Sequence, residues 1–302
     1  MTIAKKLPML IGATLFAITA AGSAQAVTLF SGTGTPGATD AFNAMKAAIG
    51  GQANAGGPKA NGFRTISWDG VRLDGTDINP NTKVIVPGTT VNIPVDRFLG
   101  QGALYAEEYT VSGDGFASVN PATAGQFPAF SPKNTFAMFD DEPGEFEDRF
   151  IEQSFTLAGT RTAAGTRGFG AIFVDVELAK SSSIEYFNGS TSLGKFFVDP
   201  APKSGDPSFL GVLFDAPIVT DVTLTVGDKA LFNFDGKTIR SFGAEDLLKG
   251  IDLAVTDDFI YAEPTTIANV PEPGTNLGLL VLGSLGTIAL LKSNKNKQKI
   301  TG

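Results

Sequence analysis

Residues 168–178 have the sequence GFGAIFVDVEL, and in its second half apolar side chains recur at every second position. Ile172, Val174 and Val176 alternate with the residues between them, and the same period returns over residues 222–226. A period of two places successive side chains on opposite faces of a β-strand, whereas an amphipathic helix repeats about every 3.6 residues. We therefore expect strands with one buried face, and the acidic residues of the quoted stretch on the other face.

Two-residue turn signals separate the predicted strands. Asn188-Gly189, Gly227-Asp228 and Asp235-Gly236 are each flanked by runs with strand character. Such dipeptides supply the positive φ that tight hairpins need. Strands spaced by roughly ten residues and joined by hairpins are typical of antiparallel sandwiches and jelly rolls. The predicted fold class is all-β, an antiparallel β-sandwich or jelly roll over residues 63–263, flanked by a signal peptide and a single C-terminal transmembrane helix.

Helix is expected in two short places only. Residues 27–62 are rich in Gly and Ala and predict an N-terminal extension with one helix. Asp40 is placed to cap that helix, whose apolar residues recur at spacings of three and four as far as Ile49, before Gly50 ends it. A second short helix is predicted over residues 244–249.

The composition excludes several classes of protein. The 302 residues contain no Cys and no His, so disulfide scaffolds, Cys/His zinc sites and His-dependent catalysis are excluded. The net charge of −8 argues against nucleic acid as a partner, because a nucleic-acid-binding domain carries a basic stripe. Residues 27–270 alone hold 17 Lys/Arg and 30 Asp/Glu, a net charge of −13.

Residues 1–26 predict a secretory signal peptide. Two lysines precede the apolar run Leu7–Ala21, and Ala24 and Ala26 supply small side chains at the two positions that signal peptidase recognises. We expect cleavage after Ala26 and export of the rest of the chain.

A second apolar segment lies close to the C-terminus. Residues 274–291 carry no formal charge, and at about 1.5 Å per residue they span roughly 27 Å as a helix, close to the ~30 Å of a bilayer core. A basic tail after an apolar segment stays cytoplasmic and attracts anionic headgroups. The segment predicts a transmembrane helix that leaves the main domain outside the cytoplasm and the tail, residues 292–302, inside. The basic residues of that tail are Lys292, Lys295, Lys297 and Lys299.

The linker over residues 264–273 ends in Val270-Pro271-Glu272-Pro273, directly before the apolar segment. Two prolines prevent helix and strand from continuing, so this tetrapeptide is extended and accessible. The order of Val-Pro-Glu-Pro, apolar segment and basic tail resembles the PEP-CTERM sorting signal. That resemblance implies recognition and processing by an exosortase-type membrane protease, with transfer to the cell surface or extracellular matrix.

The predicted sandwich also resembles a group of uncharacterised secreted bacterial jelly-roll proteins, similar in outline to carbohydrate-binding modules. The resemblance spans most of residues 63–263 and implies a fold without an established activity. It rests on four stretches: Phe63–Val71, Gly168–Val176, Ser208–Val212 and Asp257–Glu263.

Calcium is the one cofactor that the sequence suggests. Asp69, Asp257 and Asp258 lie in or beside the predicted first and last strands, which are often neighbours in jelly rolls, and Glu263 is a fourth candidate. Ca²⁺ takes six to eight oxygen ligands, many of them carboxylates. The alternative is that Asp69 belongs to a turn and one of the paired aspartates faces solvent. The acidic run over residues 140–148 is expected to be a solvated loop.

Three functions remain open. The favoured one is an exported surface protein, membrane-anchored or processed by an exosortase, that binds extracellular matrix or exopolysaccharide. The alternative is a purely structural surface protein, and the third is a glycoside hydrolase that uses paired carboxylates. No spacing singles out such a pair, so we expect no enzyme activity. A glycan site would use exposed flat aromatic side chains, for which the candidates are Trp68, Tyr105, Tyr109, Tyr186 and Tyr261.

Overall fold

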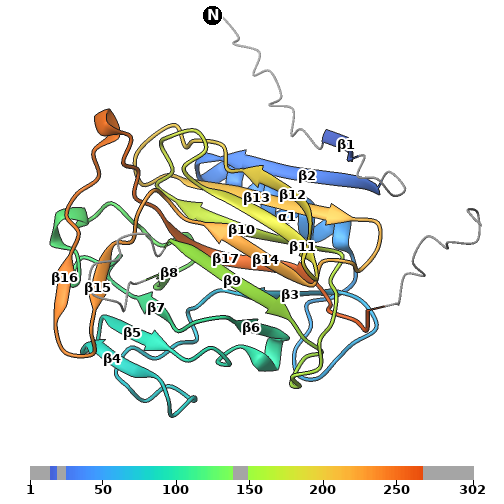
Figure 1. Ribbon diagram of the computed structural model, residues 1–302, viewed down its shortest axis with the longest axis horizontal. Coiled ribbons are helices and arrows are strands. Elements are labelled where there is room, and N and C mark those ends of the chain that lie inside the picture. The colour runs from blue at the N-terminus through green and yellow to red at the C-terminus, as the bar shows by residue number, and fades with distance from the viewer. Residues whose placement is uncertain (1–13, 19–24, 139–148, 268–302) are drawn as a thin grey trace, which may run out of the picture. The chain divides into compact units, whose positions relative to one another are not determined.

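The computed structural model describes residues 14–18, 25–138 and 149–267 (Figure 1). The acidic run at 140–148, the motif at 270–273, the apolar segment at 274–291 and the basic tail lie outside the described residues. Within the described ranges, no helix combines the length and the apolar character needed to cross a bilayer.

The described strands form two antiparallel sheets and a separate two-stranded ribbon, which confirms the all-β prediction. The ten-stranded sheet contains, in spatial order, β1 (Thr14–Ile18), β2 (Gln25–Thr33), β13 (Pro207–Phe214), β10 (Gly168–Val174), β17 (Val255–Ala262), β8 (Thr135–Ala137), β7 (Tyr109–Ser112), β5 (Thr90–Ile93) and β4 (Lys83–Val86), with β3 (Phe63–Ile66) paired to β17. The five-stranded sheet contains β12 (Thr191–Phe197), β11 (Ser183–Asn188), β14 (Asp221–Thr225), β9 (Phe150–Phe155) and β6 (Ala103–Tyr105). The ribbon pairs β15 (Phe232–Phe234) with β16 (Ile239–Ser241).

The two sheets pack face to face through aromatic side chains, which makes the domain a β-sandwich. The ring of Phe155 on β9 lies 5.3 Å from that of Tyr261 on β17, centroid to centroid. The rings of Tyr186 on β11 and Phe214 on β13 lie 5.7 Å apart. These four residues belong to one continuous apolar core drawn from both sheets.

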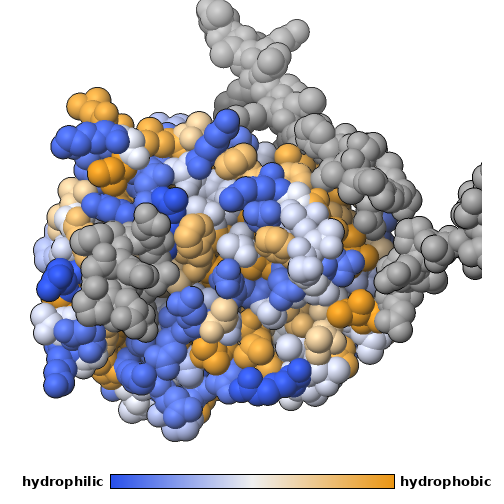
Figure 2. Space-filling view, viewed as in Figure 1, coloured by the Kyte–Doolittle hydropathy of each residue, from blue (hydrophilic) through white to orange (hydrophobic). Residues whose placement is uncertain are grey.

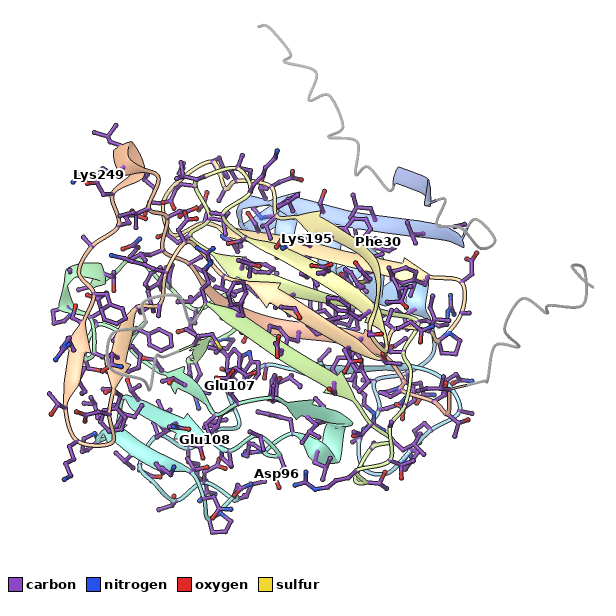
Figure 3. The ribbon with its side chains drawn as sticks, viewed as in Figure 1. Phe30, Asp96, Glu107, Glu108, Lys195 and Lys249 are labelled. Atoms are coloured by element: carbon purple, nitrogen blue, oxygen red, sulfur yellow. The ribbon has the colours of Figure 1, made fainter. Side chains whose placement is uncertain are left out.

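The outer face of the large sheet is also covered, by the helix α1 (Gly34–Ile49) and the β15–β16 ribbon. Ala38, Ala41 and Met45 of α1 are buried in a second core with Phe30 of β2, which Figure 3 labels. All seven residues of β10 and all eight of β13 are therefore buried. The prediction that β10 has one solvated face is wrong, because α1 and the ribbon replace solvent there.

The N-terminal part of the chain belongs to the sandwich. Residues 27–33 of β2 pair with β13 from Val27↔Phe214 to Thr33↔Ser208, so the expected extension over residues 27–62 supplies a strand of the large sheet. The helix begins at Gly34, where Pro36 fits its first turn because no backbone donor is needed there. It ends before Gly50, at a φ of 73°, as predicted. The prediction that Asp40 caps the helix is wrong, because Asp40 lies inside it.

The strand β1 lies within the predicted leader and pairs with β2. The ladder between β2 and β13 starts at Val27, so it lies entirely after the predicted cleavage position at Ala26. The leader and its cleavage stay predictions.

Two of the three predicted hairpins are present. Asn188-Gly189 joins β11 to β12, and Asp235-Gly236 joins β15 to β16. Gly227-Asp228 does not form the third, because β14 pairs with β11 and β9 whereas β15 pairs with β16. The helix expected at 244–249 is a single 3-10 turn, η3 (Leu247–Lys249); two others are η1 (Leu99–Gln101) and η2 (Pro121–Thr123).

Hydrophilic residues are spread over the face of the molecule seen in Figure 2, and apolar residues are scattered among them in small groups. A few large apolar side chains are nonetheless well exposed, above all Leu248 on η3 and Ile78, at 100% and 79%.

Candidate metal centre

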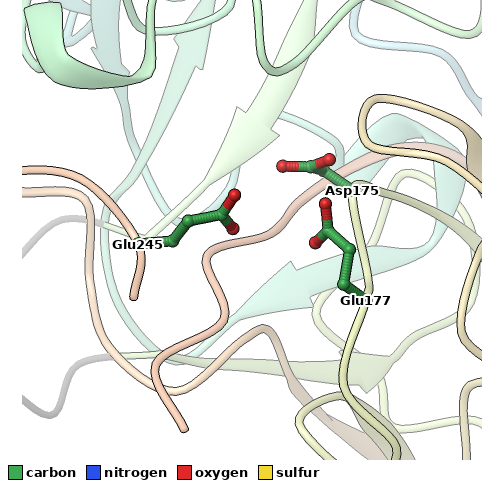
Figure 4. A group of neighbouring side chains, drawn as sticks. All are labelled: Asp175, Glu177 and Glu245. Atoms are coloured by element: carbon green, nitrogen blue, oxygen red, sulfur yellow. The ribbon is translucent and has the colours of Figure 1, made fainter. Parts of the chain in front are cut away.

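Three carboxylates that are distant in sequence converge beside the end of β10. Oxygen atoms of Asp175, Glu177 and Glu245 lie within 4.8 Å of one another. Figure 4 shows the carboxylates of Asp175 and Glu177 on one segment pointing toward Glu245 on the facing segment. The alternating pattern predicts the first two on the solvent face of a strand, and no sequence signal singles out the third.

The backbone turns sharply where the cluster begins. The strand β10 ends at Val174, and Asp175 has a φ of 70°, in the left-handed region that Asp tolerates better than most residues. One oxygen of the Asp175 carboxylate, Oδ1, accepts hydrogen bonds from Ser204 Oγ, at 2.9 Å, and from the backbone N–H of Gly205. The turn ends the period of two, which explains why the strand pattern did not predict the direction of this side chain.

The second half of the cluster comes from the loop over residues 242–254, named here the acidic loop. Asp246 and Ile251 pair across its neck, and η3 closes its tip. Glu245 and Asp252 stand on either side of that pair. Asp252 Oδ2 accepts from the backbone N–H of Leu178 at 2.8 Å and from Ser181 Oγ at 2.6 Å, so the loop is fastened to the connection between β10 and β11.

Burial and mutual repulsion change the acidity of these groups. Burial, with the facing Asp175 and Asp252 carboxylates, raises the pKa of Glu177 to about 9. Burial, followed by the charges of Asp175 and Asp252, raises the pKa of Glu245, and burial also raises that of Asp252. Without a cation, a proton on Glu177 relieves part of the repulsion at neutral pH.

The three aspartates predicted as a calcium site do lie close to one another. The strand β3, which precedes Asp69, pairs with β17, which carries Asp257 and Asp258. Ser131 Oγ lies 3.2 Å from Asp69 Oδ2 and 3.0 Å from Asp257 Oδ1. Burial and the charge of Asp258 raise the pKa of Asp257 to about 8. Protein donors already occupy both oxygens of Asp257. Calcium binding by these three aspartates stays a prediction.

Glu263, the fourth candidate, is held elsewhere. Arg64 donates to its carboxylate from Nε at 2.7 Å and from Nη2 at 2.8 Å. Lys59 N–H and Asn54 Nδ2 donate to it at 2.9 and 2.8 Å. Both oxygens are committed to a buried ion pair that ties the end of β17 to β3.

Comparison with known proteins locates a targeting signal at the C-terminal end. Residues 269–293 match the family described as PEP-CTERM protein-sorting motif. The chain carries a PEP-CTERM sorting motif. The match includes the predicted Val270–Pro273 tetrapeptide and the apolar segment after it, and it implies an exosortase-processed, membrane-associated surface protein. No curated protein and no solved structure matches the chain, so the resemblance of residues 63–263 to secreted jelly-roll proteins stays a prediction.

In this PEP-CTERM protein the flat aromatic side chains expected of a sugar site are buried. The single Trp and all four Tyr residues are at most 3% exposed: Trp68, Tyr105, Tyr109, Tyr186 and Tyr261. Trp68 stacks on Phe136 with ring centroids 3.6 Å apart, and its Nε1 donates to the carbonyl oxygen of Asp257 at 2.6 Å. These rings build the core and offer no sugar platform.

Proposed function

We propose that the protein is a structural component of the cell surface or extracellular matrix, delivered there as a folded β-sandwich by its C-terminal sorting motif. The observation that carries the proposal is the sorting motif on a chain whose Trp and Tyr side chains are all buried. A protein-sorting motif accounts for location, and the buried aromatic residues favour a structural role over glycan recognition through stacking.

The arrangement of carboxylates argues in the same direction. A glycosidase places two carboxyl groups beside the glycosidic bond, so both must reach the substrate. Asp175 is fully buried, and three oxygens, one each from Asp175, Glu177 and Glu245, all lie within 4.8 Å of one another. This close, buried grouping suits a cation better than a glycosidic bond.

The sorting part of the proposal is tested by replacing Pro271-Glu272-Pro273 with three alanines. If an exosortase acts on the motif, the variant accumulates in the membrane fraction while the wild-type chain reaches the surface or the medium. Thr266→Ala, an exposed change in the same linker, serves as the control and leaves sorting unchanged. Equal release of the triple variant and the wild type would contradict the proposal.

The structural role is tested with a glycan array probed by the purified chain. We expect no binding above background on neutral or acidic glycans. Saturable binding to any one glycan would overturn the structural role and restore the glycan-binding function predicted from the sequence.

A further inference from the structure

The carboxylate cluster beside β10 presents an unusual number of oxygens that lack a donor. Asp175 and Asp252 are each 0% exposed, yet one oxygen of each has no hydrogen-bond partner. A buried carboxylate oxygen without a partner is costly, and native proteins satisfy nearly all such groups. Five oxygens are in this position: Asp175 Oδ2, Glu177 Oε1, Glu177 Oε2, Glu245 Oε2 and Asp252 Oδ1.

Lysine and arginine do not neutralise the cluster. None of the ion pairs recorded among the described residues includes Asp175, Glu177, Glu245 or Asp252. The charges that act on Glu177 most strongly come from other carboxylates. Four acidic side chains without a basic partner leave a local charge that a bound cation would compensate.

The three oxygens lie close enough together to coordinate a single cation. Three oxygens no more than 4.8 Å apart can all lie within about 2.8 Å of a single point, the side divided by √3 for an equilateral triangle. Ca²⁺ binds oxygens at about 2.3–2.6 Å and accepts six to eight of them in irregular geometry, including bidentate carboxylates. Mg²⁺ requires a near-ideal octahedron at about 2.0–2.1 Å and keeps several waters.

We propose that Asp175, Glu177 and Glu245 bind one Ca²⁺ ion, with Asp252 beside them. Asp175 contributes the oxygen that protein donors leave free, Glu177 contributes both of its oxygens, and Glu245 contributes Oε2. The other oxygen of Asp175 stays bonded to Ser204 and the Gly205 N–H, which orient this ligand. Ser181 and the Leu178 N–H hold Asp252 next to the site.

The ion adds a second link between segments that the hydrogen bonds of Asp252 already join. It connects the end of β10, the start of the β10–β11 connection and the acidic loop. That loop carries Leu248, which is fully exposed at its tip. Calcium, abundant outside cells, would thus complete the fold of this exported domain after secretion. This inference does not depend on the proposed structural function.

Calorimetric titration of the full chain tests the site. The chain is purified in detergent, freed of metal with EDTA and titrated with CaCl₂. We expect one ion per chain at this site and a rise in Tm on the order of 5 °C at a calcium concentration a hundredfold above Kd. At equal concentration MgCl₂ gives weaker binding. Absence of both heat and a Tm shift in the wild type overturns the proposal, and equal affinity for Mg²⁺ overturns the choice of calcium.

Isosteric variants locate the binding. Glu177→Gln and Glu245→Gln each remove a ligand charge and are expected to lower the calcium affinity at least about tenfold. Asp246→Asn is the control: it lies beside Glu245, but its carboxylate pairs with Lys249 at 2.8 Å, and calcium affinity should stay the same. If Glu177→Gln retains wild-type affinity while Asp257→Asn loses it, the ion belongs to the aspartates around Ser131 and the proposal is wrong.

Discussion

The buried ion pair between Arg64 and Glu263 offers a sharp test of how this fold is held together. Their side chains are 0% and 1% exposed, and two parallel hydrogen bonds join them. Arg64→Ala removes the cation and leaves the Glu263 carboxylate buried. Breaking a buried pair in this way costs about 3–5 kcal/mol. Because Asn54 and the Lys59 N–H still donate to the carboxylate, we expect a loss near the lower end, about 3 kcal/mol.

Equilibrium urea unfolding measures this loss, with an exposed pair of the same kind as the control. Arg161 donates to Asp96, labelled in Figure 3, at 2.9 Å, but the two side chains are 60% and 33% exposed. Arg161→Ala should therefore cost less than about 1 kcal/mol. The double variant with Arg64→Met and Glu263→Gln should lose less than the sum of its single variants. Equal losses for Arg64→Ala and Arg161→Ala would refute the argument from burial.

Two further predictions concern helix packing and pH. Gly211 pairs with Gly170, and a Cβ on it would overlap Met45 Sδ of α1, so Gly211→Ala should cost about 1–3 kcal/mol in urea unfolding. Gly70→Ala is the control, because a Cβ at Gly70 would have no atom within 4 Å. Equal losses of unfolding free energy in the two variants would contradict close packing of α1 on β13. Because burial and facing carboxylates raise the pKa of Glu177 from 4.5 to about 9, the folded chain retains a proton that the unfolded chain releases. In EDTA, the stabilisation by this proton is complete below pH 4.5 and is lost as the pH rises to about 9. The free energy of unfolding of Glu177→Gln should therefore fall less steeply with pH than that of the wild type. Parallel pH profiles of the two proteins would contradict this prediction.

Local signals in the sequence predicted the strands and some of their connections. Asn188-Gly189 and Asp235-Gly236 form hairpins because their turn geometry depends on a few adjacent residues. The same signal at Gly227 was misleading. There the chain leaves the five-stranded sheet, and the glycine is needed because a Cβ would lie 2.7 Å from the carbonyl oxygen of Asp252.

The carboxylate cluster was harder to predict, because it depends on contacts between distant segments. Asp175 and Glu177 fit the alternation of a half-exposed strand, and only the left-handed turn at Asp175 removes them from it. Glu245 and Asp252 belong to the acidic loop, which lies more than sixty residues further along the chain. The one sequence signal for the cluster was that Asp175 and Glu177 directly follow a continuous apolar strand, Gly168–Val174.

The most direct test of the central claim is mass spectrometry of the chain recovered from the cell surface or the medium. We predict an N-terminal peptide that begins at Val27, peptides covering the sandwich to about residue 267, and no peptide from the tail after residue 291. Recovery of the intact chain from the cytosol, with residues 1–26 and the lysine tail both attached, would contradict export and processing.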